Sequence, residues 1–150
     1  MRALSMLKTR LIPCIFTKNE LVVQSIGFKR FLPIGSVQTA IEFFVNWDVD
    51  EIIIIDIDAS RQSRTLSASV VDIATKECFV PVTVGGGISR IDHIHDFLNA
   101  GADKVALNSA IRYDLGFVEN AANLFGNQCI TASVDVVHHG GKYHAYDHLT

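Results

Sequence analysis

Short apolar runs recur along the chain, and amphipathic stretches separate them. Five runs are continuously apolar rather than alternating, which is typical of strands covered on both faces in a parallel sheet. They occupy residues 11–15, 51–57, 80–84, 104–107 and 129–137. Four stretches between them repeat apolar residues at helical spacing. These lie at residues 37–47, 66–75, 92–99 and 117–125.

The order of these elements predicts an α/β fold made of successive strand–helix units. Such alternation forms either a doubly wound sheet or a (β/α)8 barrel, and periodicity alone does not choose between them. A barrel takes about 250 residues, whereas this chain has 150. We therefore expect a single domain over residues 1–150 with five strands and four helices.

Composition narrows the class of protein. Apolar residues make up 49% of the chain and charged residues 19%, as in a folded globular domain. A net charge of −3 and scattered basic residues indicate no nucleic-acid partner. The apolar runs are far shorter than the roughly 20 residues that cross a bilayer, and no signal-peptide pattern is present, so we expect no membrane partner. Three widely spaced cysteines predict free, buried thiols in the cytoplasm.

A triple glycine at residues 85–87 ends the third predicted strand and opens a helix. The backbone N–H groups of Gly86 and Gly87 can approach an anion because no Cβ is in the way. The positive end of the following helix points to the same place. The pattern predicts a phosphate cradle, and the alternative is a tight turn without a ligand. The spacing is not that of a dinucleotide-binding fingerprint.

The next strand ends in a second turn suited to phosphate, at Asn108 and Ser109. Because the carboxyl ends of parallel strands meet at one rim, this turn should lie beside the triple glycine. Together Gly86, Gly87, Asn108 and Ser109 predict a site for a phosphorylated small molecule. The alternative is that Asn108 or Ser109 only caps a helix.

Carboxylates interrupt or end two of the apolar runs, at Asp56, Asp58 and Asp135. Burying an unpaired carboxylate is costly, so carboxylates at a barrel rim are candidates for acid/base chemistry. Asp135 is the best-placed catalytic candidate, and the alternative is a loop-capping or ion-paired carboxylate. The six histidines lack the spacing of known ligand sets, so we expect no metal and no other cofactor.

Three charged residues, Arg10, Glu51 and Lys104, lie at the opposite ends of the predicted strands. If these strands are parallel and adjacent, the three charges share one rim. They could form a charged gate into the interior of the sheet. From the residues alone, a solvated ring of salt bridges is the better interpretation.

Four motifs, taken in order, resemble the cyclase subunit of imidazole glycerol phosphate synthase, the HisF family. They are Leu-Ile-Pro-Cys at 11–14, the segment 50–60, Thr-Val-Gly-Gly-Gly-Ile at 83–88 and the segment 101–110. The resemblance runs from about Lys8 to the C-terminus, and Met6 matches the usual start of the family. Residues 1–5 are therefore expected to be an upstream extension. The resemblance implies a (β/α)8 barrel of which this chain covers about the first half, ending in a polar loop at residues 138–150.

The resemblance also implies an activity and a partner. HisF proteins are lyases of histidine biosynthesis, which use ammonia from a glutaminase subunit, HisH, to make imidazole glycerol phosphate and aminoimidazole carboxamide ribotide. A heterodimer with a HisH-like glutaminase is therefore expected. Gly87, Asn108 and Ser109 match the phosphate site of the family, and Asp135 matches one of its two catalytic aspartates.

Within this family the charged residues gain a specific interpretation. Arg10, Glu51 and Lys104 match three of the four residues that gate the entry of ammonia. The resemblance therefore favours a gate over a solvated ring of salt bridges.

Residue 16 departs from the pattern of the family. The other catalytic aspartate of HisF proteins follows the Ile-Pro-Cys-Leu run, and Phe16 stands there in this chain. Phenylalanine cannot transfer a proton, and loss of one member of a cooperating pair costs orders of magnitude in rate. Asn19, Glu20 and Gln24 also differ from the family. These changes are similar to those of a divergent HisF-like branch found with surface-polysaccharide genes. The resemblance implies that proteins of this branch deliver ammonia to a sugar-modifying amidotransferase.

We therefore expect a HisF-like cyclase subunit whose cyclase activity is impaired by Phe16 and by the lack of the second half of the barrel, with its second phosphate site. Three alternatives stay open. They are an ammonia-channelling partner for sugar amidation, an inactive fragment and a non-enzymatic phosphate-binding module.

Overall fold

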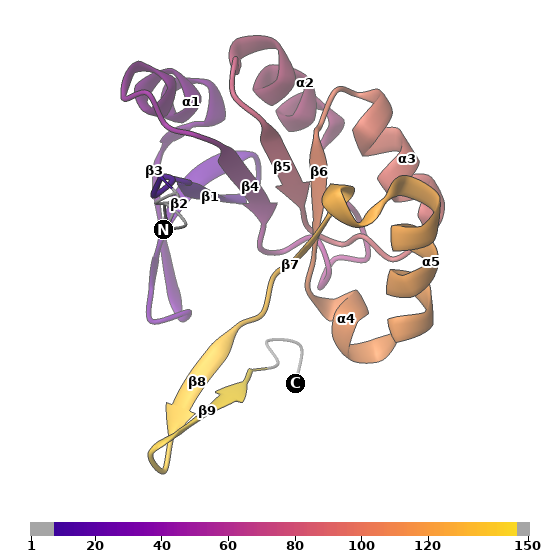
Figure 1. Ribbon diagram of the computed structural model, residues 1–150. Helices are drawn as coiled ribbons and strands as arrows, with labels where there is room; N and C mark the ends of the chain where they lie inside the picture. Colours follow the sequence, from indigo (N-terminus) through magenta and orange to yellow (C-terminus); the bar gives the residue numbers. More distant parts are fainter. Residues whose placement is uncertain (1–7, 147–150) are drawn as a thin grey trace, which may run out of the picture.

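The computed structural model describes residues 8–146, which form a seven-stranded sheet flanked by helices and a separate two-stranded hairpin (Figure 1). The strands are β1 (Cys14–Lys18), β2 (Leu21–Ile26), β3 (Arg30–Ser36), β4 (Ile52–Asp56), β5 (Val82–Gly85), β6 (Lys104–Leu107), β7 (Ile130–Ala132), β8 (Val136–His139) and β9 (Lys142–Ala145). The helices are α1 (Val37–Asn46), α2 (Ala68–Glu77), α3 (Ile91–Asn99), α4 (Ser109–Tyr113) and α5 (Leu115–Phe125), with a 3-10 turn at Asn127–Cys129.

The centre of the sheet is parallel. The strand order is β3-β2-β1-β4-β5-β6-β7, and β1, β4, β5, β6 and β7 pair in parallel along it. These correspond to the five strands predicted from the continuous apolar runs, and α1, α2, α3 and α5 fall at the four predicted helices. The α/β prediction is confirmed, and the parallel arc is consistent with part of a (β/α)8 barrel.

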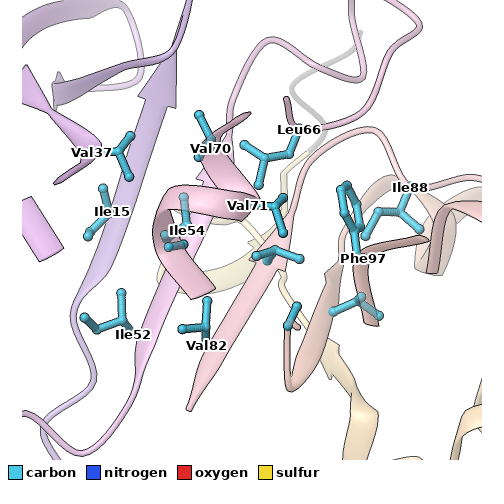
Figure 2. Close-up of a cluster of buried hydrophobic side chains, with 14 of the residues drawn as sticks. Ile15, Val37, Ile52, Ile54, Leu66, Val70, Val71, Val82, Ile88 and Phe97 are labelled. Atoms are coloured by element: carbon cyan, nitrogen blue, oxygen red, sulfur yellow. The ribbon is translucent and has the colours of Figure 1, made fainter. Parts of the chain in front are cut away.

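The main core lies between the sheet and the helices that cover one of its faces (Figure 2). Ile52 and Ile54 of β4 are buried there with Val70 of α2. Successive side chains of a strand point to opposite faces, so Ile53 and Ile55 point away from the helices, and they are only half-buried. The prediction that both faces of the strands are covered holds for β5, where Thr83 is also buried, but was wrong for the second face of β1 and β4, which is only partly covered.

We call this second face of β1 and β4 the inner face, defined by Cys14, Phe16, Ile53 and Ile55. The first two lie in parallel register with the last two. Cys14 is exposed on this face, which corrects the prediction of three buried thiols. The three cysteines are free, and Cys78 and Cys129 are partly buried.

An antiparallel hairpin, β2–β3, stands between the first strand and the first helix, where the sequence analysis assigned no element. Two tight turns build it. Asn19 and Glu20 connect β1 to β2 with φ of 50° and 62°, and Gly27 and Phe28 turn the hairpin tip with φ of 58° and 57°. Consecutive positive φ values are typical of two-residue hairpin turns. The hairpin projects on the side toward which β4 and β5 point (Figure 1).

The C-terminal segment, residues 129–146, differs from the prediction in two ways. The strand expected at 129–137 is divided, because β7 ends at Ala132 and β8 starts at Val136. The polar loop expected at 138–150 is wrong for residues 138–145, which belong to the β8–β9 hairpin. Gly140 and Gly141, with φ of 59° and 77°, make the tight turn of this hairpin. The polar residues around them had indicated a loop instead. Residues 147–150 and the expected extension at 1–5 lie outside the described residues.

Within residues 8–146, none of the helices has the length and apolar character needed to cross a membrane.

Candidate functional site

A cavity of about 140 Å³ opens at the carboxyl ends of the parallel strands. We call it the rim pocket. Seven candidate site residues selected from the sequence line it together, namely Asp56, Asp58, Gly86, Gly87, Asn108, Ser109 and Asp135. Parallel strands bring their carboxyl ends to one edge, which is why turns far apart in the chain meet here.

The triple-glycine turn is shaped by a neighbouring loop. Gly86 and Gly87 have φ of 122° and 68°, which favour glycine. A Cβ on Gly87 would overlap the backbone oxygen of Arg64, and one on Gly86 would lie 2.7 Å from that of Asp56. The close packing of this loop therefore requires both glycines, whether or not an anion binds. The phosphate role of the turn stays a prediction.

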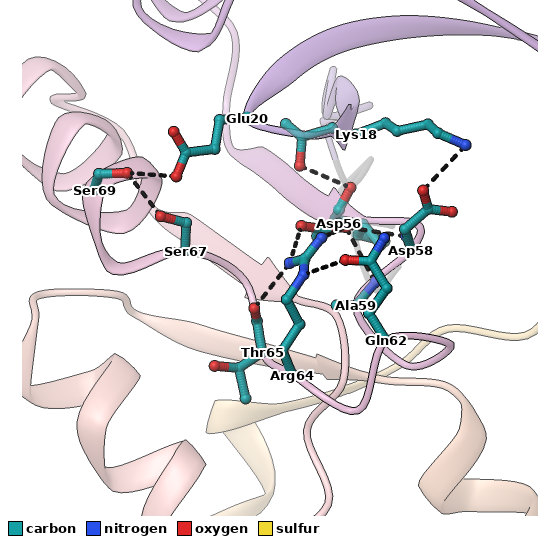
Figure 3. Close-up of polar contacts among 12 residues, drawn as sticks. Lys18, Glu20, Asp56, Asp58, Ala59, Gln62, Arg64, Thr65, Ser67 and Ser69 are labelled. Atoms are coloured by element: carbon teal, nitrogen blue, oxygen red, sulfur yellow. Dashed lines mark hydrogen bonds and ion pairs between the residues drawn. The ribbon is translucent and has the colours of Figure 1, made fainter.

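The carboxylate of Asp56 organises the loop after β4 (Figure 3). It accepts hydrogen bonds from the backbone N–H groups of Asp58 and Ala59 at 3.0 and 3.1 Å, and from Nη1 and Nη2 of Arg64 at 2.6 and 3.3 Å. The hydrogen bond to Asp56 raises the pKa of Arg64 above its usual value. Asp58 forms an ion pair with Lys18 at 3.0 Å. Asp56 and Asp58 thus match the alternative of loop-capping, ion-paired carboxylates.

Asn108 and Ser109 lie where β6 passes into α4, a short helix that the sequence analysis did not predict. Asn108 makes no side-chain cap to this helix. Instead its Nδ2 donates to Oδ2 of Asp135 at 3.1 Å. The hydroxyl oxygen of Ser109 is buried and has no hydrogen-bond partner among the described residues. A buried hydroxyl without a partner costs free energy, so a ligand or water that bonds it would be favoured.

The opposite wall of the rim pocket is aromatic. Phe16 of β1 lines it with Phe28 and Phe31 of the β2–β3 hairpin. Phe16 pairs with Ile55, which lines the same pocket. The pocket therefore presents an apolar side chain at the position where the HisF pattern has an aspartate. The two hairpin aromatics could not be placed from the sequence, because no pattern there indicated the hairpin.

At the other ends of the strands, Glu51 joins the predicted charged residues. Lys104 Nζ lies 2.7 Å and Arg10 Nη1 lies 3.5 Å from Oε2 of Glu51. The hydroxyl of Thr83 donates to Oε1 at 2.8 Å. The sequence analysis missed Thr83 in this role, although its place on β5 next to β4 could have indicated it.

The Glu51 side chain is only 5% exposed. Burial is the largest influence on its pKa and pushes it up, but the hydrogen bonds from Lys104 and Thr83 and the nearby cations outweigh burial, so the pKa lies below its usual value. The buried carboxylate is therefore held in its charged form by its partners.

The described residues contain no cluster of side chains that could hold a metal ion. No three His, Cys, Asp or Glu side chains in residues 8–146 lie close enough to share an ion. His148 lies outside the described residues.

The fold and the position of the pocket define a class before any comparison. This is an α/β protein with part of a (β/α)8 barrel, whose candidate site lies at the carboxyl ends of parallel strands. The family described as "Histidine biosynthesis protein" matches residues 10–148, and the chain belongs to this family.

Curated relatives confirm the HisF resemblance within that family. The chain is 60% identical over 143 residues to "Putative imidazole glycerol phosphate synthase subunit hisF2" of Vibrio vulnificus, covering 95% of this chain and 53% of that protein. A protein of the same name from Campylobacter jejuni is 46% identical, covering 95% and 57%. "Imidazole glycerol phosphate synthase subunit HisF" of an Exiguobacterium species is 38% identical, covering 94% and 55%. The chain spans about half the length of these relatives.

Proposed function

We propose that the chain acts as a HisF-like subunit that admits ammonia beside Glu51 and conducts it to the rim pocket, with little cyclase activity of its own. The observation that carries the proposal is the contrast between the two ends of the inner face. Around Glu51 the ion pairs with Arg10 and Lys104 are in place. At the rim pocket, Phe16 stands where cyclase chemistry in the family uses a second carboxylate.

The inner face between these ends suits ammonia rather than ammonium. Its side chains at Ile53, Phe16 and Ile55 are apolar. Apolar surroundings make a bare cation costly, and Lys104 and Arg10 repel cations at the entrance. Ammonium therefore gives a proton to water outside the charged residues, and the neutral ammonia molecule crosses.

At the rim pocket, a phosphate group of the ligand is held by backbone N–H groups of Gly86, Gly87 and Ser109 and by the side chain of Asn108. Asp135 is the carboxylate available for proton transfer. It lacks the partner aspartate that HisF proteins carry at the position of Phe16. Ring closure is expected to be slow for this reason, whereas delivery of ammonia does not need the second carboxylate.

A second candidate function is delivery of ammonia to another acceptor, a sugar-modifying amidotransferase in surface-polysaccharide biosynthesis. Phe16 favours this candidate, because an apolar residue at the pocket is compatible with passing ammonia on.

The experiment combines the 150-residue chain with a HisH-type glutaminase subunit. We expect a heterodimer, faster glutamine hydrolysis than by the glutaminase alone, and cyclase turnover with free ammonia close to background. Glu51→Ala should remove the stimulation, whereas Asp72→Asn, on an exposed face of α2, should leave it unchanged. Cyclase turnover comparable to that of a full-length HisF would contradict the impaired activity. Phosphate binding without formation of a glutaminase complex would favour the binding module. Absence of both phosphate binding and complex formation would favour the inactive fragment.

A further inference from the structure

We propose that Arg64, acting through Asp56, is a positioning residue for the anion site, because it sets the shape of the Gly86–Gly87 turn without touching the ligand. The inference rests on the proposed phosphate site and deepens it. It concerns the β4–α2 loop, residues 57–67, in which the sequence analysis gave Arg64 no role.

The first step is the carboxylate of Asp56, which receives four hydrogen bonds. Two come from the start of the loop, at Asp58 and Ala59, and two come from Arg64 near its end. The Asp56 side chain is 3% exposed. A buried carboxylate is stable only when charged donors and N–H groups satisfy it. Asp56 therefore ties the two ends of the loop together, and Arg64 supplies the only positive charge among these donors.

The second step is the contact between the loop and the turn. Leu66 N–H donates to the backbone oxygen of Gly86 at 3.3 Å, and the Arg64 N–H donates to the backbone oxygen of Ala59 at 3.0 Å. The backbone of Arg64 lies so close to Gly87 that no Cβ fits between them. The position of Arg64 therefore limits where the Gly86–Gly87 turn can lie.

The third step concerns what Arg64 does not do. Its Nε donates to Gln62 Oε1 at 2.7 Å, and its Nη1 donates to the oxygen of Thr65 at 3.1 Å as well as to Asp56. Arg64 also lines a second cavity, together with Gly87, His93 and Ser109. The guanidinium is thus committed to the loop. From these hydrogen bonds we infer that Arg64 affects anion binding through the turn.

The consequence is a turn that is shaped before an anion arrives. A cradle of backbone N–H groups binds well only when those groups already converge, since ordering them on binding costs affinity. Arg64 and Asp56 would hold that convergence. Removing the charge should loosen the turn first and weaken anion binding as a result.

The test compares three variants of the 150-residue chain. Arg64→Met removes the donated hydrogen bonds, and Arg64→Lys keeps the charge without the two-pronged geometry. Lys76→Met is the matched control, because it breaks the exposed ion pair with Asp72 on α2, at 2.8 Å. Hydrogen exchange of the peptide that contains Gly86 and Gly87 is measured without ligand. Binding of inorganic phosphate is measured by 31P line broadening.

We expect Arg64→Met to speed exchange at the turn and to weaken phosphate binding about tenfold, the loss typical when a group that orients a ligand-binding group is removed. Arg64→Lys should lie between Arg64→Met and the parent, and Lys76→Met should match the parent. Unchanged exchange at the turn in Arg64→Met, or equal losses in Lys76→Met, would overturn the inference. If Arg64→Met does not fold, the exchange and affinity of Arg64→Lys decide the matter.

The outcomes also separate this inference from the proposed function. If the parent chain binds no phosphate, the phosphate site is refuted. The exchange measurement then decides alone whether Arg64 shapes the turn. If the parent binds phosphate and Arg64→Met binds it equally well with a loosened turn, the site stands and the positioning role falls.

Discussion

Residue 16 faces Ile55 across the parallel pair of β1 and β4, at the level of the rim pocket. A side chain in this place has a structural and a chemical consequence at once. Phenylalanine adds apolar contacts to an otherwise half-covered face, and it removes the proton carrier that the HisF pattern has there. The two consequences can be separated by substitution.

We expect Phe16→Asp to lower the free energy of unfolding by about 1–3 kcal/mol, because a carboxylate without a partner replaces apolar contacts. Phe16→Leu, which stays apolar, should lose less. Cyclase turnover should remain at background in both when residues 1–150 are tested alone, because they span only about half the length of the HisF relatives. Urea denaturation and an assay with free ammonia check this. Measurable turnover by Phe16→Asp in the 150-residue chain would be the contrary result.

Glu51 makes stability depend on pH. Its pKa in the folded chain lies below the ordinary value, so the charged form stabilises the fold fully above the ordinary glutamate pKa of about 4.3. That stabilisation is lost as the pH falls from this value through the folded pKa. In Glu51→Gln the same loss is absent. We therefore expect the difference in melting temperature between parent and Glu51→Gln to shrink in acid. Equal shifts of both proteins from neutral to acidic pH would contradict the role of Glu51.

At the scale of elements, the β2–β3 hairpin is fastened at its base. Lys18 bonds to Asp58 at 3.0 Å and lies 5.2 Å from the ring centre of Phe31. Glu20 accepts a hydrogen bond from the Ser69 hydroxyl at 3.1 Å. Hydrogen bonds from Ser67 and Ser69 lower the pKa of Glu20. The aromatic wall of the rim pocket is thus linked to the loop that shapes the glycine turn.

We expect Lys18→Met to speed hydrogen exchange in β2 and β3 several-fold, because it removes the ion pair with Asp58 and the cation–π contact with Phe31. Lys29→Met makes the same chemical change at the exposed hairpin tip and should have little effect. Hydrogen exchange followed by mass spectrometry measures both. A similar response from the two variants would show that Lys18 does not fasten the hairpin.

The elements that sequence analysis found and missed differ in a physical respect. Parallel strands such as β4 carry apolar side chains on both faces, one packed against helices and one half-buried, so an unbroken apolar run marks them. Both strands of the β8–β9 hairpin are exposed, and polar residues such as His138 interrupt any apolar pattern that would indicate a strand. The same holds for the site, where only residues that follow from a regular pattern could be predicted. Gly87 and Asn108 could be predicted because parallel strands place turns at one rim, whereas Arg64 acts through a loop whose path no local pattern reveals.

At the scale of the whole molecule, the inner face is the part of the sheet whose side chains are least covered. Ile53, Ile55 and Phe16 are half-buried there, and Cys14 is exposed. Ile52 and Val82 lie on the opposite face, in the core beneath the helices. The sheet ends in β3 and β7, which are its edges. Open apolar faces and unpaired edges favour association.

We expect the isolated 150-residue chain to self-associate or to aggregate at micromolar concentration rather than to remain monomeric. Burial of the inner face against a second sheet would remove its apolar side chains from water. Sedimentation and thermal melting measure this. A single, cooperatively melting species near 16.5 kDa would refute it.

Strand polarity also has an evolutionary consequence. The charged residues around Glu51 belong to strand starts, and the rim pocket belongs to strand ends and the loops beyond them. Glu51 and Ile55, which lines the rim pocket, lie four residues apart on the same face, about 13 Å at the rise of a strand. Mutations at one end therefore leave the other end almost untouched. Under the proposed function, substitutions at the rim pocket, such as Phe16, would change the acceptor of ammonia while the entrance beside Glu51 is inherited unchanged.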